Sequence, residues 1–184
     1  MDTVGSYLGG RMLVAVGDIC TYQGDAIVNA ANSSLAGGGG VDGAIHRAAG
    51  KALDEACRVL RAGPFPDGLP AGKAVATTAG ALALKAVIHT VGPIWRGGNA
   101  EEARLLASAY RSSLAIAAKE AWDHIAFPAI STGVYGYPKD EAARIAFKSI
   151  RDFLAANELP KTVCLVFYVA HAAKLFLSTA DALA

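Results

Sequence analysis

The sequence is poor in charged residues and carries almost no excess of either sign. Charged side chains occupy 18% of its 184 positions, and 17 Lys and Arg offset 16 Asp and Glu to a formal net charge of +1. A chain with this balance lacks the bulk attraction that draws proteins to nucleic acid or to anionic membranes, so neither is expected as a partner. Hydrophobic residues make up 53% of the chain. That share allows a large buried core and excludes intrinsic disorder.

Cysteine is also scarce. The three cysteines, Cys20, Cys57 and Cys164, are far apart in the chain and show no CxxC spacing. Scattered cysteines in odd number argue against a disulfide framework and against a structural zinc site, so we expect no metal. The chain also lacks a basic segment followed by an apolar one at its start, and it lacks an unbroken apolar run of about 18 residues. These absences favour a soluble, cytoplasmic protein.

Short apolar runs alternate with longer stretches of helical periodicity. We expect strands at 12–16, 26–28, 74–77, 86–91, 125–130 and 163–168. Most of these runs are continuously apolar, which is typical of strands covered on both faces. Helices are expected at 45–61 (as one helix or two), 101–121, 138–156 and 172–182. The alternation predicts an α/β fold with a largely parallel sheet between helices, in a single domain over 1–184 whose core spans about 11–178.

Four consecutive glycines, 37–40, follow the predicted strand at 26–28 and a polar turn, and they lead into a helix that begins near Val41 or Asp42. Such a run carries a large entropic cost on folding. Its physical use is that backbone N–H groups without neighbouring Cβ atoms can surround an anion, and the N-terminus of the next helix adds further N–H groups. The pattern indicates a diphosphate site. The alternative is a mobile surface loop.

Two other phosphate motifs fit this chain poorly. Gly38, Gly40 and Gly43 satisfy G-x-G-x-x-G, but a polar segment separates them from the strand, and the only nearby acid, Asp67, lies in a Pro/Gly loop. A dinucleotide site needs the glycines directly after the strand and an acid at the end of the next one. The stretch 68–73 is one residue short of a Walker A loop. Neither motif is adopted.

Asp42 and Asn32 flank the glycine run. Asp42 lies beside the predicted phosphate site, where a carboxylate can orient or deprotonate a water molecule. Its alternative role is that of an N-cap or a first-turn acid of its own helix. Asn32 can bind sugar hydroxyls, and its alternative role is to form a turn. His46 lies one helical turn after Asp42 and is interpreted as structural, since it pairs with no nucleophile and is not at metal-ligand spacing from Cys57.

A second loop has a similar design. The predicted strand at 125–130 runs into a segment with two glycines, two hydroxyl side chains and two tyrosines before a helix, 131–138. This composition predicts a second anion site with aromatic walls. The alternative is a turn whose tyrosines cover the core. Because α/β sheets bind ligands at the carboxyl ends of their strands, we expect the two loops to form one site.

Two further polar residues stand at strand ends. Asp18 follows the first predicted strand and could accept a hydrogen bond from an exocyclic amine, or serve only as a turn residue. His89 ends an apolar strand and is interpreted as a hydrogen-bonded core histidine.

Five blocks of the sequence resemble macrodomains of the MacroD type, and among these the bacterial O-acetyl-ADP-ribose deacetylases. In chain order the blocks are 17–19, 25–32, 37–50, 88–93 and 127–138. They extend over nearly the whole chain, from about residue 12 to residue 176. The resemblance implies a three-layer α/β/α macrodomain with a mixed, largely parallel central sheet that binds ADP-ribose across the two loops.

The resemblance also implies roles for individual residues. Asp18 and Ile19 match the contacts to adenine, and Tyr168 matches an aromatic residue near the adenosine. Asn32 matches the asparagine that holds the distal ribose, and Asp42 matches the catalytic aspartate. The diphosphate-binding positions correspond to Gly39, Gly40 and Val41 in the first loop and to Ser131, Thr132, Gly133, Val134 and Tyr135 in the second, with Tyr135 closing over the distal ribose. No metal or redox cofactor is implied.

The sequence departs from the family pattern at three places. Cys20 stands where Thr is usual, and Ala83-Leu84 replaces Pro-Ala. Val169-Ala170-His171 follows Tyr168 where an acidic stretch is common, which affects the adenosine end of the site.

The resemblance therefore predicts a hydrolase that cleaves an ester on the distal ribose. Its substrate would be O-acetyl-ADP-ribose, or proteins that carry mono-ADP-ribose on Asp or Glu. The attacking water would be positioned by Asp42 or, as the alternative, by a phosphate oxygen of the substrate. The alternative is a reader that binds ADP-ribose without hydrolysis. A third class, a protein bound to RNA or to a regulatory partner, gains no support from the net charge of +1. A monomer is expected.

Overall fold

A computed structural model describes residues 1–184. Seven strands form one mixed sheet in the order β1-β2-β7-β6-β3-β5-β4. Their bounds are β1 Asp2–Tyr7, β2 Met12–Val16, β3 Ala26–Ala30, β4 Ala74–Thr78, β5 Ala86–Thr90, β6 His124–Phe127 and β7 Thr162–Phe167. The five central strands are parallel, and the edge strands β1 and β4 are antiparallel to their neighbours.

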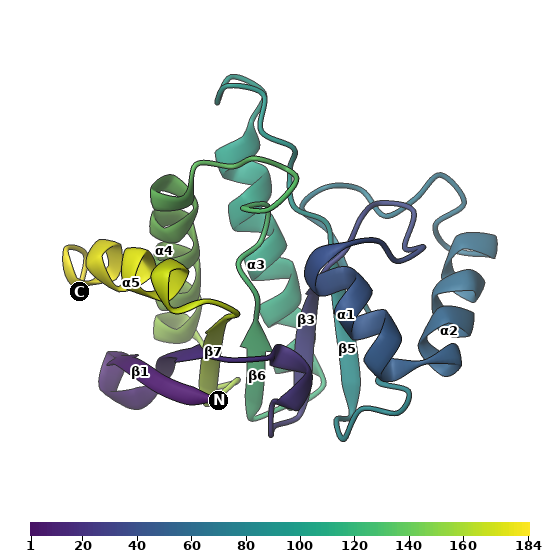
Figure 1. The fold of residues 1–184 in the computed structure, drawn as a ribbon, viewed down its shortest axis with the longest axis horizontal. Helices are drawn as coiled ribbons and strands as arrows, with labels where there is room; N and C mark the ends of the chain where they lie inside the picture. Colours follow the sequence, from purple (N-terminus) through teal and green to yellow (C-terminus); the bar gives the residue numbers. More distant parts are fainter.

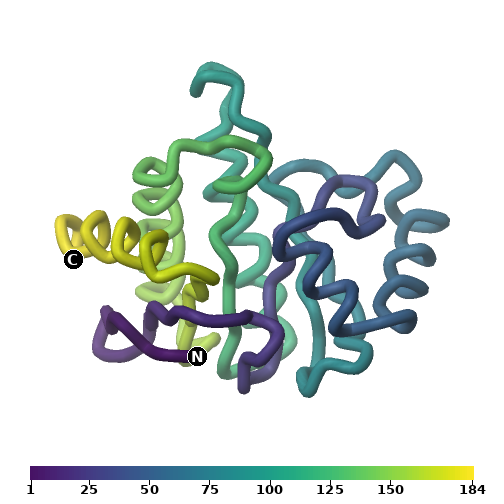
Figure 2. The backbone as a smooth tube through the Cα atoms, viewed as in Figure 1, coloured from purple at the N-terminus to yellow at the C-terminus, as the bar shows by residue number.

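Five α-helices cover the two faces of this sheet. They are α1 Gly40–Ala49, α2 Lys51–Ala62, α3 Glu102–Lys119, α4 Lys139–Ala156 and α5 Ala170–Asp181, and two short 3₁₀ helices, η1 Leu8–Gly10 and η2 Ile19–Thr21, follow β1 and β2. In Figure 1 α1 and α2 lie together at one end of the molecule, and α4 and α5 lie at the other. In Figure 2 the C-terminus lies at the outer end of α5, and the N-terminus lies nearer the middle of the molecule.

The core divides into two hydrophobic clusters, one on each face of the sheet. Successive residues of β3 show the division: Ala26 and Val28 belong to the cluster under α3, α4 and α5, whereas Ile27 belongs to the cluster under α1 and α2. Because strand side chains alternate between faces, a central strand must be apolar on both. The three-layer α/β/α architecture predicted from the sequence is confirmed.

Several predicted boundaries are wrong. The N-terminal strand β1 was not expected, since its residues are mostly exposed and show no apolar run. The strand expected at 125–130 ends at Phe127, because Pro128 has no N–H to continue the ladder. The segment 45–61, expected as one helix or two, forms two, since Gly50 adopts a φ of 73° between α1 and α2, but the first of them already begins at Gly40. The last helix begins at Ala170, before the expected residue 172.

No helix combines the length and the apolar character needed to cross a bilayer.

Candidate functional site

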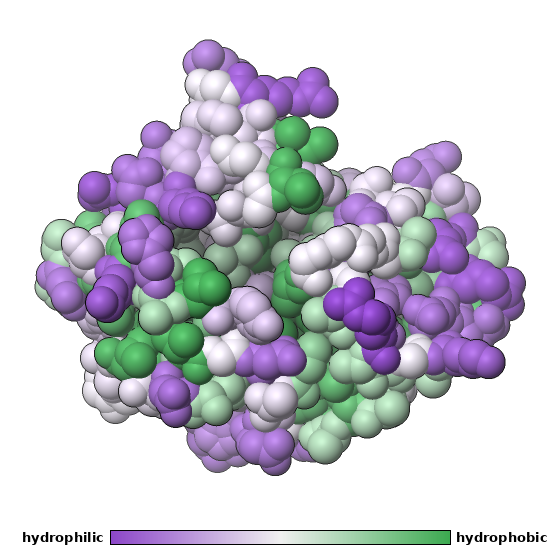
Figure 3. Space-filling model, viewed as in Figure 1, coloured by the Kyte–Doolittle hydropathy of each residue, from purple (hydrophilic) through white to green (hydrophobic).

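The carboxyl ends of the parallel strands meet at one edge of the sheet. The arrowheads of β3, β6 and β7 point the same way in Figure 1, and the loops that follow them lie together at that end. The glycine loop connects β3 to α1, and the second loop connects β6 to α4. In the same view, Figure 3 shows a hollow near the centre of the molecular surface. An open α/β sheet binds its ligands in such a place.

The glycine loop leaves its backbone accessible at the start of α1. A Cβ atom added at Gly39 or Gly40 would meet no atom within 4 Å, and Gly40 has a φ of 59°, in the left-handed region. Gly43 instead permits close packing, because a Cβ there would collide with the carbonyl oxygen of Gly38. The first N–H groups of a helix have no acceptor within it. The loop therefore presents free N–H groups and open space together, as an anion site requires.

Asp42 lies in the first turn of α1 but does not cap it. The N-cap is Gly39, and the buried carboxylate of Asp42 faces the end of β3. Its Oδ1 accepts a hydrogen bond from Nδ2 of Asn29 at 2.7 Å. Its Oδ2 lies 3.4 Å from Nδ2 of Asn32. Asp42 is thus a first-turn acid, one of the expected alternatives, but it is not an N-cap. Its carboxylate is contacted by two amide groups and by Nε2 of His46 at 3.5 Å.

Asn32 also organises the glycine loop. Its Nδ2 donates to the carbonyl oxygen of Gly37 at 2.8 Å. Its Oδ1 accepts from the hydroxyl of Ser34 at 2.6 Å. The turn-forming alternative is thus observed, and the same amide reaches Asp42.

The second loop, which follows β6, lies at the same end of the sheet as the glycine loop. Burial, and secondarily the charge of Asp42, raises the pKa of Tyr135. The loop is closed by hydrogen bonds from the N–H of Gly136 to the carbonyl of Gly133 at 2.9 Å and from the N–H of Tyr137 to the carbonyl of Ser131 at 3.0 Å. Ser131 adopts a φ of 65°.

The remaining positions of the second loop differ in their surroundings. Ser131 is buried and its Oγ has no partner, whereas Val134 is fully exposed. Thr132 bonds weakly to the carbonyl of Ala129, and Gly133 has open space beside it. Tyr137 is buried and packs on Trp95. It thus covers the core, as the alternative for the tyrosines of this loop expected.

Asp18, Ile19 and Tyr168 lie at the ends of two paired strands. β2 and β7 are parallel neighbours with Val16 opposite Phe167. One carboxylate oxygen of Asp18 accepts from the N–H of Cys20 at 2.9 Å, the turn role considered as the alternative. Ile19 is buried, and Tyr168 is 81% exposed. Because Val169 is the N-cap of α5, the non-acidic segment after Tyr168 is already the start of that helix.

Sequence reasoning missed a buried polar cluster behind Asp42. Possible ligand atoms of His46, Cys57 and His89, from α1, α2 and β5, lie within 4.8 Å of one another. Both ring nitrogens of His89 are engaged, Nδ1 at 3.2 Å from Nδ2 of Asn29 and Nε2 at 2.9 Å from the hydroxyl of Thr77. His46 bonds Asp54 through Nδ1 at 2.7 Å. The ring atoms of His89 are thus used by hydrogen bonds rather than left for an ion.

Burial of His89 makes the stability of the fold depend on pH. Burial, and secondarily the charge of His46, lowers the pKa of His89 to about 4. The folded protein therefore keeps this ring neutral at pH values where the unfolded chain, with a pKa of about 6.5, takes up a proton. This stabilisation is complete above pH 6.5 and is lost as the pH falls toward 4. We expect the free energy of unfolding to drop by on the order of 3 kcal/mol over that interval.

Urea unfolding at a series of pH values measures this drop. The His89→Gln variant has no ring to titrate, so its free energy of unfolding should fall much less between pH 6.5 and pH 4. Parallel curves for the two proteins would show that His89 is not the group responsible.

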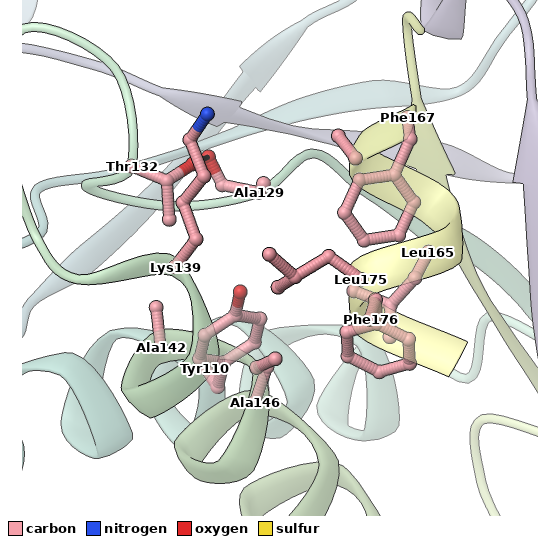
Figure 4. A pocket seen from close by; sticks show the side chains of 12 residues that line it. Tyr110, Ala129, Thr132, Lys139, Ala142, Ala146, Leu165, Phe167, Leu175 and Phe176 are labelled. Carbon is pink, nitrogen blue, oxygen red and sulfur yellow. Dashed lines mark hydrogen bonds between the residues drawn. The ribbon is translucent and has the colours of Figure 1, made fainter. Parts of the chain in front are cut away.

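An apolar pocket lies beside the second loop, on the face of the sheet that α3, α4 and α5 cover. Its wall is formed mainly by α4, α5 and β7, and Figure 4 shows Leu175 and Phe176 of α5 opposite Tyr110. Thr132 belongs to both the loop and the pocket wall. The pocket lacks the polar groups found around Asp42. It is therefore distinct from the polar site.

Comparison with known proteins finds similarity along nearly the whole chain. A family model described as "Macro domain" matches residues 28–146. A protein of Cronobacter sakazakii named O-acetyl-ADP-ribose deacetylase is 56% identical over 161 residues, which cover 88% of each chain. A protein of Salmonella typhimurium with the same name is 54% identical over 166 residues, covering 90% of this chain and 92% of that one.

Solved structures give the same result. The Oceanobacillus iheyensis macrodomain with ADP has a TM-score of 0.90 and 42% identity, covering 94% of this chain and 90% of that one. The Trypanosoma brucei macrodomain in complex with ADP-ribose has a TM-score of 0.81 and 37% identity, covering 92% of this chain and 68% of that one.

Proposed function

This chain belongs to the Macro domain family, and from that premise we propose that it binds ADP-ribose and hydrolyses the ester of O-acetyl-ADP-ribose. The relatives named above are deacetylases, and the related solved structures contain ADP or ADP-ribose. The observation that carries the proposal is the buried carboxylate of Asp42, held by Asn29 and Asn32 next to an open glycine loop.

In this proposal the diphosphate is bound by main-chain N–H groups. Gly39, Gly40 and Val41 supply them from the first turn of α1, and residues 131–135 supply the opposite wall. A helix N-terminus favours a bound anion through both its free N–H groups and its dipole. Asp18, Ile19 and Tyr168 bind the adenosine. The fixed diphosphate then sets the position of the distal ribose, with Asn32 and Tyr135 on either side of it.

The reaction needs a water molecule placed against the acetyl carbonyl carbon. Asp42 accepts a hydrogen bond from that water and receives its proton as the carbon–oxygen bond forms. The bond between the acyl carbon and the ribose oxygen then breaks, and the proton passes to the ribose oxygen, giving acetate and ADP-ribose. Holding water and ester in a fixed geometry supplies much of the rate acceleration. The residues of the site provide this positioning themselves.

Removal of mono-ADP-ribose from Asp or Glu of proteins is the second substrate class in this proposal. It involves the same kind of ester on the same sugar. The tip of the second loop is open, with Val134 fully exposed, which supports access for a bulky acyl group. The same residues would act on both substrates.

A side-by-side assay tests the proposed function. Acetate release from O-acetyl-ADP-ribose and ADP-ribose release from a glutamate-modified protein are measured with the same enzyme preparation, and calorimetry measures ADP-ribose binding. We expect binding together with hydrolysis of O-acetyl-ADP-ribose. Binding without turnover of either ester would identify a reader, and absence of binding would refute the proposal.

A further inference from the structure

Behind Asp42, a series of polar side chains joined by hydrogen bonds extends across three strands of the sheet. Asn29 on β3 stands opposite His89 on the neighbouring β5, and Thr77 lies on β4, the next strand. Asn29 and His89 are both completely buried. The other side chains on this face, including Ile27 and Val87, are apolar. Polar groups buried in such surroundings are costly unless they are hydrogen-bonded, so the bonds they make are informative.

The donor and acceptor of each hydrogen bond in this series of side chains follow from the chemistry of Asp42. Oδ1 of Asp42, as a carboxylate oxygen, can only accept, so the group 2.7 Å from it must be the nitrogen of the Asn29 amide. The second hydrogen on this nitrogen faces Nδ1 of His89 at 3.2 Å. Nδ1 therefore accepts, and in the neutral ring Nε2 carries the proton.

The hydrogen bonds of Thr77, at the other end of the series, agree with this assignment. The hydroxyl of Thr77 donates to the carbonyl oxygen of Thr78 at 3.0 Å. Its oxygen is then free to accept from Nε2 of His89 at 2.9 Å. Burial keeps the pKa of His89 low, at about 4, so the ring is neutral at pH 7. An imidazolium would instead present an N–H to the Asn29 nitrogen, and two donors would face each other.

The Asn29 amide makes no hydrogen bonds beyond those to Asp42 and His89. Its Oδ1 is buried and has no hydrogen-bond partner. The two N–H bonds are thus the only directional contacts of the amide, and loss of the bond to His89 removes one of the two that set its rotation about χ2. A change in this rotation moves the donor that holds the carboxylate of Asp42.

We propose that His89 is a positioning residue for ester hydrolysis, which accepts a hydrogen bond from Asn29 and thereby orients the amide that holds Asp42. This inference rests on the role proposed for Asp42 in hydrolysis. Thr77 acts one step further out, by fixing the tautomer of His89. Neither side chain belongs to the diphosphate loops, so ADP-ribose affinity does not depend on them.

The kinetic test replaces members of this series and one apolar neighbour. His89→Leu removes the acceptor for Asn29, and we expect kcat for O-acetyl-ADP-ribose to fall about 10- to 100-fold, as small displacements of reacting groups do. Thr77→Val removes only the outer acceptor, and a fall of about threefold is expected on the same grounds. The Kd for ADP-ribose should stay within about threefold of wild type in both variants.

Val87→Ala is the matched control. Val87 is fully buried on the same strand and face, so its truncation loosens the core without touching the polar series. Its kcat should stay near wild type. In the Asp42→Ala background, His89→Leu should cause no further loss of kcat. Full kcat in His89→Leu, or an equal loss in Val87→Ala, would overturn the positioning role.

A spectroscopic measurement tests the proposed hydrogen bonds of His89 without using activity. Long-range nitrogen–proton correlation spectra of the wild-type protein should show His89 as a neutral ring with its proton on Nε2 at pH 7. A proton on Nδ1 would refute the inference, even if His89→Leu failed to fold. If wild type hydrolyses neither ester, the proposed function fails, and with it the positioning role, whatever the tautomer. If wild type is active but His89→Leu is unimpaired, only the positioning role fails.

Discussion

Replacement of Asp42 by alanine is expected to lower kcat for O-acetyl-ADP-ribose by a factor of about 10² to 10⁴, the usual contribution of a positioned general base. The Kd for ADP-ribose should change by less than about fivefold, because the main-chain N–H groups that bind the diphosphate remain in place. The carboxylate accepts a hydrogen bond from Asn29 and is buried next to the glycine loop. Single-turnover assays of acetate release, with calorimetry for binding, measure the two effects separately.

Asp140 provides a matched control for this variant. It lies in the first turn of α4, as Asp42 does in α1, but its side chain is exposed. Asp140→Ala should leave both kcat and Kd near their wild-type values. Unchanged turnover in Asp42→Ala would refute the role proposed for the carboxylate. A large loss of ADP-ribose affinity in that variant would show instead that Asp42 acts mainly in binding.

Replacement of Gly133 by aspartate should weaken ADP-ribose binding by about 100-fold, which corresponds to about 2.7 kcal/mol. A Cβ at Gly133 would meet no atom within 4 Å, and its φ lies outside the left-handed region, so the variant should fold with wild-type stability. The added carboxylate would face the diphosphate, and like charges brought together at a binding site cost several kcal/mol. Calorimetry gives the Kd, and thermal unfolding checks the fold.

Gly133→Asn separates the effect of charge from that of size. Asparagine has nearly the same volume as aspartate and no charge, so its loss of affinity should be clearly smaller. Added salt should narrow the difference between the two variants, because salt screens exposed charges. Equal affinity in Gly133→Asp and wild type would show that the diphosphate does not lie over the second loop.

The architecture was largely predictable because strands and helices have different apolar periods. The strand at 12–16 and the helix at 138–156 match the structure to within one residue. β1 escaped prediction because an exposed edge strand needs no apolar run. The overlong strand at 125–130 resulted from reading apolar residues beyond Pro128 as part of the ladder.

The candidate site was predictable where its residues are close in the chain. Asn32 and Asp42 flank one loop, and the family resemblance marks both. Asn29, by contrast, is buried among apolar residues of β3, and only its hydrogen bond to Asp42 shows what it does. His89 was expected to be a hydrogen-bonded core histidine, and it is one. Its connection to Asp42 through Asn29 could not be inferred, because the strand order that makes β3 and β5 neighbours is not visible in the pattern.

The sequence by itself determined the local features: which segments form strands and helices, where glycines leave the backbone open, and which acid lies in the first turn of α1. These depend on residues within a few positions of one another. Only the tertiary structure decided that Thr77, His89 and Asn29 form one series of hydrogen bonds that leads to Asp42. The reason is that strand order and register, set by packing of the whole sheet, choose which distant residues become neighbours.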